Sequence, residues 1–108
     1  MSVVSNSGRI GVADLAAGTP VNLGTLGAAM TVNVLICNRN ASTVTTPKVR
    51  IAISTSAITP ADSEWIDYDT QVFNARERGG IAASAGENIW IISDTSAVSA
   101  RAHGVLLP

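Results

Sequence analysis

Histidine is the side chain that most often acts as a general base near neutral pH, and this sequence contains one, His103. A nucleophilic triad would need Ser99 or Ser96 as the nucleophile and Asp94 to orient the imidazole. If residues 98–103 form a strand, Ser99 and His103 share a face but lie about 13 Å apart, too far for a hydrogen bond. We therefore interpret His103 as a surface or interface residue, and we expect no enzymatic activity.

Four acidic residues gather in one short segment, where carboxylates could bind a hard cation such as calcium. On an alternating strand, Asp67 and Asp69 would share one face. The segment lacks the glycine turn and the terminal bidentate glutamate of an EF-hand loop, and such cations need about six or more oxygen ligands. We favour the alternative, an acidic strand paired with Arg76 and Arg78 within the chain or across a subunit boundary. The four acids are Asp62, Glu64, Asp67 and Asp69.

The two tryptophans are half of the aromatic residues, so each is expected to anchor either the core or an interface. Trp90 lies within the apolar run of residues 89–92 and is predicted to be buried. Trp65 stands beside acids and is predicted to be exposed at an interface. There it could also stack on a sugar, with Asp67 and Asp69 beside it.

The composition indicates a protein that associates with copies of itself. Hydrophobic residues make up 46% of the chain and charged residues 14%, whereas soluble domains carry about 25% charged residues. Because few charged side chains are available for the exterior, much of it must be small or aliphatic, and such a surface with a net charge of -1 favours association. We expect a homo-oligomer.

Several partners are excluded by the same inventory. The 7 Lys and Arg residues are dispersed, which argues against nucleic acid because phosphate binding needs clustered positive charge. The first ten residues have no charged and apolar leader, and no apolar run approaches the roughly 20 residues that span a bilayer. We expect a protein made and kept in a cytosol, without a membrane partner.

One cysteine, Cys37, rules out an intrachain disulfide and any cysteine-only metal cluster. Two chains could still pair through this thiol, but we favour a buried thiol on a core strand. Phosphate-binding loops and paired metal cysteines are missing from the sequence, so we expect no cofactor and no metal site.

Alternation with a period of two runs through the sequence and predicts an all-β protein. About seven or eight short strands, spaced by 8 to 12 residues, indicate an antiparallel sandwich or jelly roll. We expect one domain over residues 1–108, with residues 1–8 as an extended N-terminal arm. The expected strands lie near residues 10–12, 21–23, 30–37, 48–53, 65–69, 71–78, 89–92 and 98–103.

The best-defined strand, residues 30–37, is followed by a turn-rich stretch over 38–46 and then by the alternating strand 48–53. This order predicts a hairpin-like pair.

Five segments in this order resemble a group of small β-sandwich proteins encoded among the virion structural genes of tailed bacteriophages. They are VNVLICNRN (32–40), KVRIAIS (48–54), EWIDYD (64–69), ERGGIAASAGENIWI (77–91) and VSARAHGVL (98–106), and the resemblance covers Gly8 to Leu106. The sequence departs from that pattern at Trp65, where a tyrosine is more familiar, and in the alanine-rich stretch 81–86.

The resemblance implies a symmetric virion component present in many copies, assembled in the bacterial cytoplasm, and it implies no catalytic residues. Capsid surface, collar and tail or fibre locations all stay open. The leading hypothesis is thus a non-enzymatic virion structural protein that contacts its own copies and other virion proteins. The alternative is a carbohydrate- or receptor-binding module that recognises a host surface glycan. The candidate contact residues are Trp65, Asp67, Asp69, Arg76, Arg78, Arg101 and His103.

Overall fold

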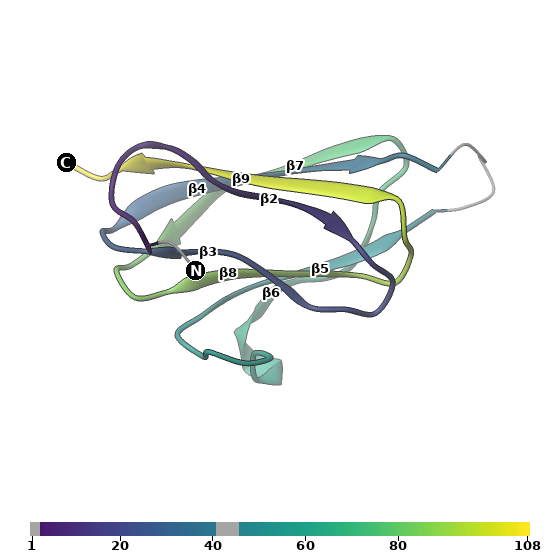
Figure 1. Cartoon of the computed structure of the whole chain (residues 1–108), viewed down its shortest axis with the longest axis horizontal. Helices are drawn as coiled ribbons and strands as arrows, with labels where there is room; N and C mark the ends of the chain where they lie inside the picture. Colours follow the sequence, from purple (N-terminus) through teal and green to yellow (C-terminus); the bar gives the residue numbers. More distant parts are fainter. Residues whose placement is uncertain (1–2, 41–45) are drawn as a thin grey trace.

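Two β-sheets pack face to face in the computed structural model, which describes residues 3–40 and 46–108 (Figure 1). One sheet has the strand order β1-β3-β8-β5-β6, and the other has the order β2-β9-β4-β7. This sandwich confirms the predicted fold class. The elements are β1 (Val3–Val4), β2 (Gly8–Leu15), β3 (Val21–Leu26), β4 (Met30–Asn38), β5 (Lys48–Ser54), the 3-10 turn η1 (Asp62–Glu64), β6 (Trp65–Gln71), β7 (Ala75–Ala83), β8 (Asn88–Ser93) and β9 (Val98–Leu106).

The core lies between the two sheets and follows from the alternation of each strand. On β4, the buried side chains are those of Met30, Val32, Val34 and Ile36, and each outward neighbour is at least partly exposed. The other sheet contributes apolar side chains from β5 and β8 to the same cluster. Each such side chain stabilises the fold by about 1.5–3 kcal/mol relative to an exposed position, so the sandwich depends on keeping this register.

The sheets approach one another most closely where β2 meets β3. A Cβ atom on Gly11 would lie 1.7 Å from the carbonyl oxygen of Leu23, and one on Gly24 would lie 2.5 Å from Cγ2 of Ile10. Only glycine allows this approach, because any other side chain would overlap a backbone or packed core atom. The two glycines therefore close one side of the sandwich.

The predicted hairpin between residues 30–37 and 48–53 is wrong. β4 lies between β9 and β7 in the four-stranded sheet, whereas β5 lies between β8 and β6 in the five-stranded sheet. The chain crosses from one sheet to the other between them, and residues 41–45 of that connection lie outside the described residues. Two consecutive strands show the same alternation whether they pair as a hairpin or lie in different sheets. The order of the strands along the sequence therefore does not distinguish a hairpin from a crossover.

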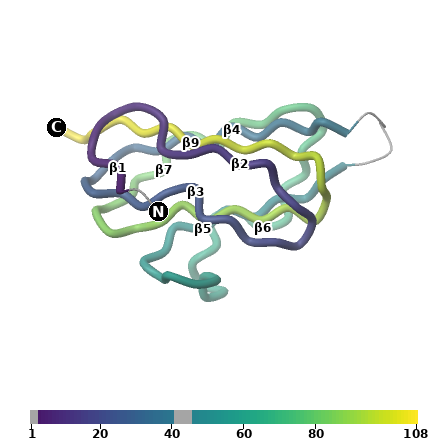
Figure 2. The backbone as a smooth tube through the Cα atoms, viewed as in Figure 1, coloured from purple at the N-terminus to yellow at the C-terminus, as the bar shows by residue number. Residues whose placement is uncertain are grey.

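Residues 3–8 of the expected N-terminal arm are described, and part of them is paired. β1 runs parallel to β3, with Val3 opposite Thr25. The amide of Leu106 donates a hydrogen bond to the Ser7 hydroxyl at 2.9 Å. The first described residues and the C-terminus thus lie at the same end of the sandwich (Figure 2).

The segment between β5 and β6 covers part of the outer face of the five-stranded sheet. Asn88 donates hydrogen bonds to the carbonyls of Ser54 and Ser56, at 3.1 and 3.0 Å, and the indole of Trp90 reaches the Ser56 carbonyl at 3.4 Å. Pro60 in the same segment is buried. Trp90 is only 8% exposed, which confirms its predicted burial, although it lies on the outer face of its sheet and not in the central core.

Candidate interaction surface

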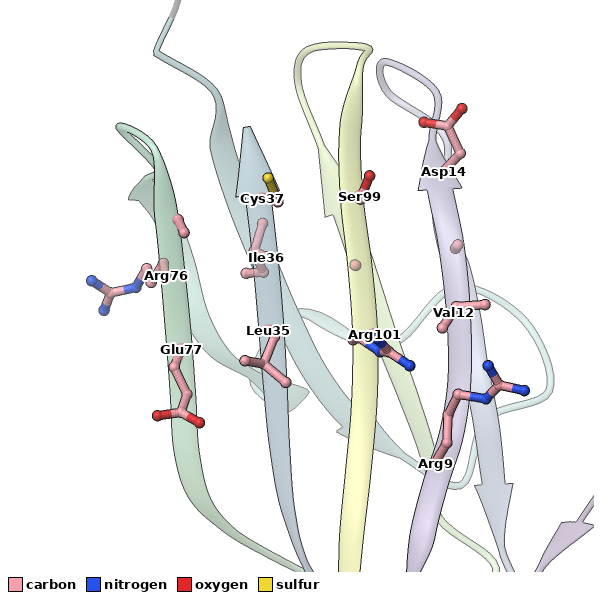
Figure 3. Close-up of a pocket in the computed structure, with 13 residues that line it drawn as sticks. Arg9, Val12, Asp14, Leu35, Ile36, Cys37, Arg76, Glu77, Ser99 and Arg101 are labelled. Carbon is pink, nitrogen blue, oxygen red and sulfur yellow. The ribbon is translucent and has the colours of Figure 1, made fainter. Parts of the chain in front are cut away.

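Within residues 3–40 and 46–108, no segment covers the outer face of the four-stranded sheet as the segment between β5 and β6 covers the other sheet. We call this surface the four-strand face and define it by the outward side chains of its strands. Thirteen residues from β2, β9, β4 and β7 line an open hollow of about 850 Å³ there (Figure 3). The outward residues of the four strands include Arg9, Val12, Asp14, Thr31, Asn33, Leu35, Cys37, Ala75, Glu77, Ala82, Ser99, Arg101, His103 and Val105.

The strand register arranges these side chains in rows across the sheet, because residues directly opposite one another point to the same face. The central row runs from Val12 through Arg101 and Leu35 to Glu77. Figure 3 shows Leu35 between Arg101 on β9 and Glu77 on β7. Leu35 is 39% exposed and Val12 is 56% exposed. Leu35 therefore lies near the middle of this face, with Arg101 on one side and Glu77 on the other, and Val12 lies beyond Arg101 on the edge strand β2.

The two charged residues of the central row are free of ion pairs within the described residues. The ion pairs there join Arg39 to Asp14, Arg50 to Asp69 and Arg78 to Asp67. Arg101 and Glu77 take part in none of them, and both are exposed. Their charges are thus available to a partner.

Cys37 belongs to a second row, which runs from Asp14 through Ser99 and Cys37 to Ala75. Its thiol is free and exposed, so the prediction of a buried thiol is wrong. The reason is its position in the alternation: Cys37 shares the outward face of β4 with Leu35, and that face carries no covering layer within the described residues.

His103 lies on the same face in a third row, opposite Arg9 on β2 and Asn33 on β4. It is partly buried. The Asn33 amide oxygen accepts a hydrogen bond from the Gly80 amide at 3.1 Å, which ties this row to the bulge in β7. Arg101 and His103, both predicted contact residues, therefore do share the four-strand face.

The side chains considered for a catalytic triad are not brought together. Ser99 and His103 occupy different rows of β9, two alternations apart. The Asp94 carboxylate lies in the turn before β9, where it accepts hydrogen bonds from the Lys48 amide and the Thr95 hydroxyl, at 2.9 and 2.7 Å. The Ser96 hydroxyl accepts a bond from the amide of Ala17. No pair among them has the contact that would activate a serine.

Asp67 points between the sheets and not outward. It pairs in register with the buried Ile51, and its Oδ1 accepts a hydrogen bond from Nε of Arg78 at 3.0 Å. Arg78 lies on β7, so this contact joins the edge strands of the two sheets. Asp67 Oδ2 is buried without a hydrogen-bond partner in the described part of the chain. The predicted pairing of Arg78 with one of the acids is confirmed, and this contact joins the two sheets along their β6 and β7 edges.

Asp69 has a different partner, so the prediction that Asp67 and Asp69 share a face is wrong. The register shifts between Asp67 and Thr70, and Asp69 has a φ of 55°, which interrupts the alternation. Its Oδ1 accepts a hydrogen bond from Nε of Arg50 at 2.7 Å, and Arg50 also lies 3.7 Å from the Tyr68 ring centroid. The hydrogen bond from Arg50 lowers the pKa of Asp69 and raises that of Arg50.

Arg76 and Trp65, both predicted contact residues, lie on different sheets and not at one common site. Arg76 is exposed and extends past the edge of the sheet in Figure 3, and no ion pair among the described residues includes it. Trp65 is half-buried, at the start of β6 in the other sheet. Of the seven predicted contact residues, Arg101 and His103 lie on the four-strand face and Arg76 lines the β7 edge of its hollow, whereas Trp65, Asp67, Asp69 and Arg78 lie elsewhere.

Metal-ligating residues do not cluster in the part of the chain that the structure describes. No three His, Cys, Asp or Glu side chains come together over residues 3–40 and 46–108. The same residues include no helix that is long and apolar enough to span a membrane.

No protein-family model, curated protein or solved structure matches this sequence. The similarity to phage virion proteins therefore stays a prediction that rests on the order of its strand segments.

The sequence-based prediction did not include four other residues of the four-strand face, which are Val12, Leu35, Cys37 and Glu77. The signal for two of them was present, because Leu35 and Cys37 alternate with the buried residues of β4. Which face of that strand is buried is visible in the pattern, but whether the other face is covered is not.

Proposed function

We propose that this protein is a non-enzymatic structural subunit that assembles through the four-strand face, and that the assembly is a bacteriophage virion. One observation carries the first part: Leu35 is exposed on an inner strand of this sheet, and the charges on either side of it, Arg101 and Glu77, have no ion-pair partner in the described chain. The opposite outer face is partly covered by the chain's own segment around Ser56 and Pro60. An uncovered apolar centre with charged neighbours is typical of a surface that binds another protein.

The composition supports the same proposal independently. With 14% charged residues and a net charge of -1, the protein has little electrostatic repulsion between copies. A contact repeated by symmetry in a multicopy assembly becomes stable even when each single contact is weak. The virion itself is proposed from the resemblance of the strand segments, and the capsid surface, the collar and the tail are all consistent with it.

The alternative of a glycan-binding module around Trp65 has less support. A sugar site there would use the carboxylates of Asp67 and Asp69 as acceptors. One of these pairs with Arg78 between the sheets, and the other is held by Arg50. Each carboxylate is thus already paired with an arginine, and Asp67 is in addition only 14% exposed, which leaves little of it accessible to a sugar.

Light scattering on the purified protein tests the assembly part of the proposal. We expect a mass above that of the monomer at micromolar concentration, and a clean monomer mass under these conditions contradicts it. The virion part is tested on purified particles. Peptides of this protein in their digest, together with density for its sandwich in an electron-microscopy map, would support it, whereas particles that lack the protein would refute it.

A further inference from the structure

We infer that the partner of the four-strand face is a second copy of the same face, related by a two-fold axis that runs along β4. This inference rests on the proposed assembly function and names the surface and the partner for it. The order of the strands and the positions of the unpaired charges Arg101 and Glu77 support this arrangement.

A two-fold axis in the plane of the contact can take two principal directions. An axis along the strands exchanges the two neighbours of β4, so that β9 of one copy faces β7 of the other. An axis across the strands places each strand on its own equivalent and reverses its direction. The two arrangements bring different side chains together, and the charges distinguish them.

The charges favour the axis along β4. Arg101 and Glu77 lie opposite Leu35 in the register, one on each side. With the axis through β4, Arg101 faces the partner's Glu77, and the same contact forms a second time by symmetry. With an axis across the strands at this row, Arg101 would face the partner's Arg101, and the two acids would also meet. Like charges in direct opposition are unfavourable, whereas two complementary pairs fix the alignment.

The residues on the axis are compatible with meeting their own copies. The outward residues of β4 are Thr31, Asn33, Leu35 and Cys37, and none of them is an acidic or basic residue. Leu35 would then pack on the partner's Leu35 at the centre, between the two Arg-Glu pairs. The exposed thiol of Cys37 lies one alternation away, so the two thiols would be close across the axis.

The size of the face suits a modest but specific contact. With the axis on β4, the strands β9, β4 and β7 face the partner, and the edge strand β2 lies outside the overlap. Three strands about 4.8 Å apart, each about nine residues long, cover about 14 Å by 30 Å. Two such faces bury about 900 Å², which is in the range of weak, concentration-dependent contacts. Because packed sheets are rotated by about 30°, the match is best near the axis, where Leu35 lies.

Charge reversal with compensation tests the proposed pairing. Arg101→Glu and Glu77→Arg each replace two attractive contacts with two repulsive ones, so we expect the dimer Kd to rise by about tenfold or more. The double variant R101E/E77R swaps the charges and should return the Kd to near the wild-type value. Sedimentation velocity over a concentration series measures all four proteins, and circular dichroism checks that each is folded.

Cross-linking through cysteine tests the position of the axis. We expect a short bismaleimide to join two chains through Cys37, since both thiols add to the reagent from opposite sides of the axis. In a Cys37→Ser background, a chain with Ser99→Cys should cross-link poorly to itself. Mixing it with a chain that carries Ala75→Cys should restore the cross-link, because β9 of one copy lies opposite β7 of the other.

The outcomes separate this inference from the proposed function. If the wild-type protein associates but neither charge reversal changes its Kd, or the double variant stays as weak as the single ones, this contact is wrong and the assembly function stands. If Ser99→Cys chains cross-link as well alone as in the mixture, the axis is wrong. A wild-type protein that stays monomeric overturns both.

Discussion

Replacing Arg78 by alanine should destabilise the fold strongly while leaving the self-association of the folded protein unchanged. The Asp67 side chain is 14% exposed, and that of Arg78 is 34% exposed. Removing one partner of a fully buried ion pair costs about 3–5 kcal/mol, because the other charge is left without compensation. Since both side chains keep some contact with water, we expect about 2 kcal/mol for Arg78→Ala.

Urea unfolding measures this loss, and a matched control lies two residues away on the same strand. Arg76 is exposed and outside the ion pairs of the described residues, so Arg76→Ala should change the free energy of unfolding by no more than about 0.5 kcal/mol. The double variant Asp67→Ala/Arg78→Ala should cost less than the sum of the two single changes, because it leaves no unpaired charge.

Two results would refute this reasoning. Equal losses for Arg76→Ala and Arg78→Ala would mean that the contact between the sheets contributes nothing beyond an exposed arginine. A double variant that costs the full sum would mean that Asp67 and Arg78 act independently. A weaker dimer at unchanged stability would instead return Arg78 to the interface role that the sequence first indicated.

Two further predictions concern the fold and its pH dependence. Gly11→Ala should lower the free energy of unfolding by about 3 kcal/mol or more, because the added methyl meets a backbone carbonyl, whereas Gly79→Ala meets only a side-chain oxygen at 3.1 Å and should cost much less in urea unfolding. Asp69→Asn tests the Arg50 contact: because that contact lowers the folded-state pKa of Asp69, its stabilisation is present above about pH 4 and is lost as the pH falls through the folded-state pKa. The urea midpoints of wild type and this variant should therefore differ at pH 7 and converge towards pH 2; a constant difference would contradict this.

The strands were predictable from the sequence because each has one apolar face, and the sandwich needs that alternation to bury Val32, Val34 and Ile36. Trp90 was correctly predicted as buried from its apolar neighbours. The predicted partnership of Arg78 with an acid of β6 was also correct. These are local properties, since they depend on the type of a residue and of its immediate neighbours along the chain.

The candidate surface was less predictable, because it depends on which strands become neighbours. Cys37 was expected to be buried, yet it is exposed, since the four-strand face has no covering layer in the described chain. Asp67 and Asp69 were expected on one face, but the bulge at Asp69 separates them. A bulge is an extra residue in one strand of a pair, and it shifts which of the following residues face inward. The residue types around Asp69 do not reveal this shift, because polar side chains occur on both sides of it.

The sequence by itself determined the fold class and the low surface charge, because alternation and composition are properties of single residues and their neighbours. Only the tertiary structure decided that β4 lies between β9 and β7, and this order brings Arg101 and Glu77 to either side of Leu35. These three residues come from strands far apart along the chain. Their pairing depends on long-range register, which is selected by the packing of the whole core and not by any local stretch of sequence.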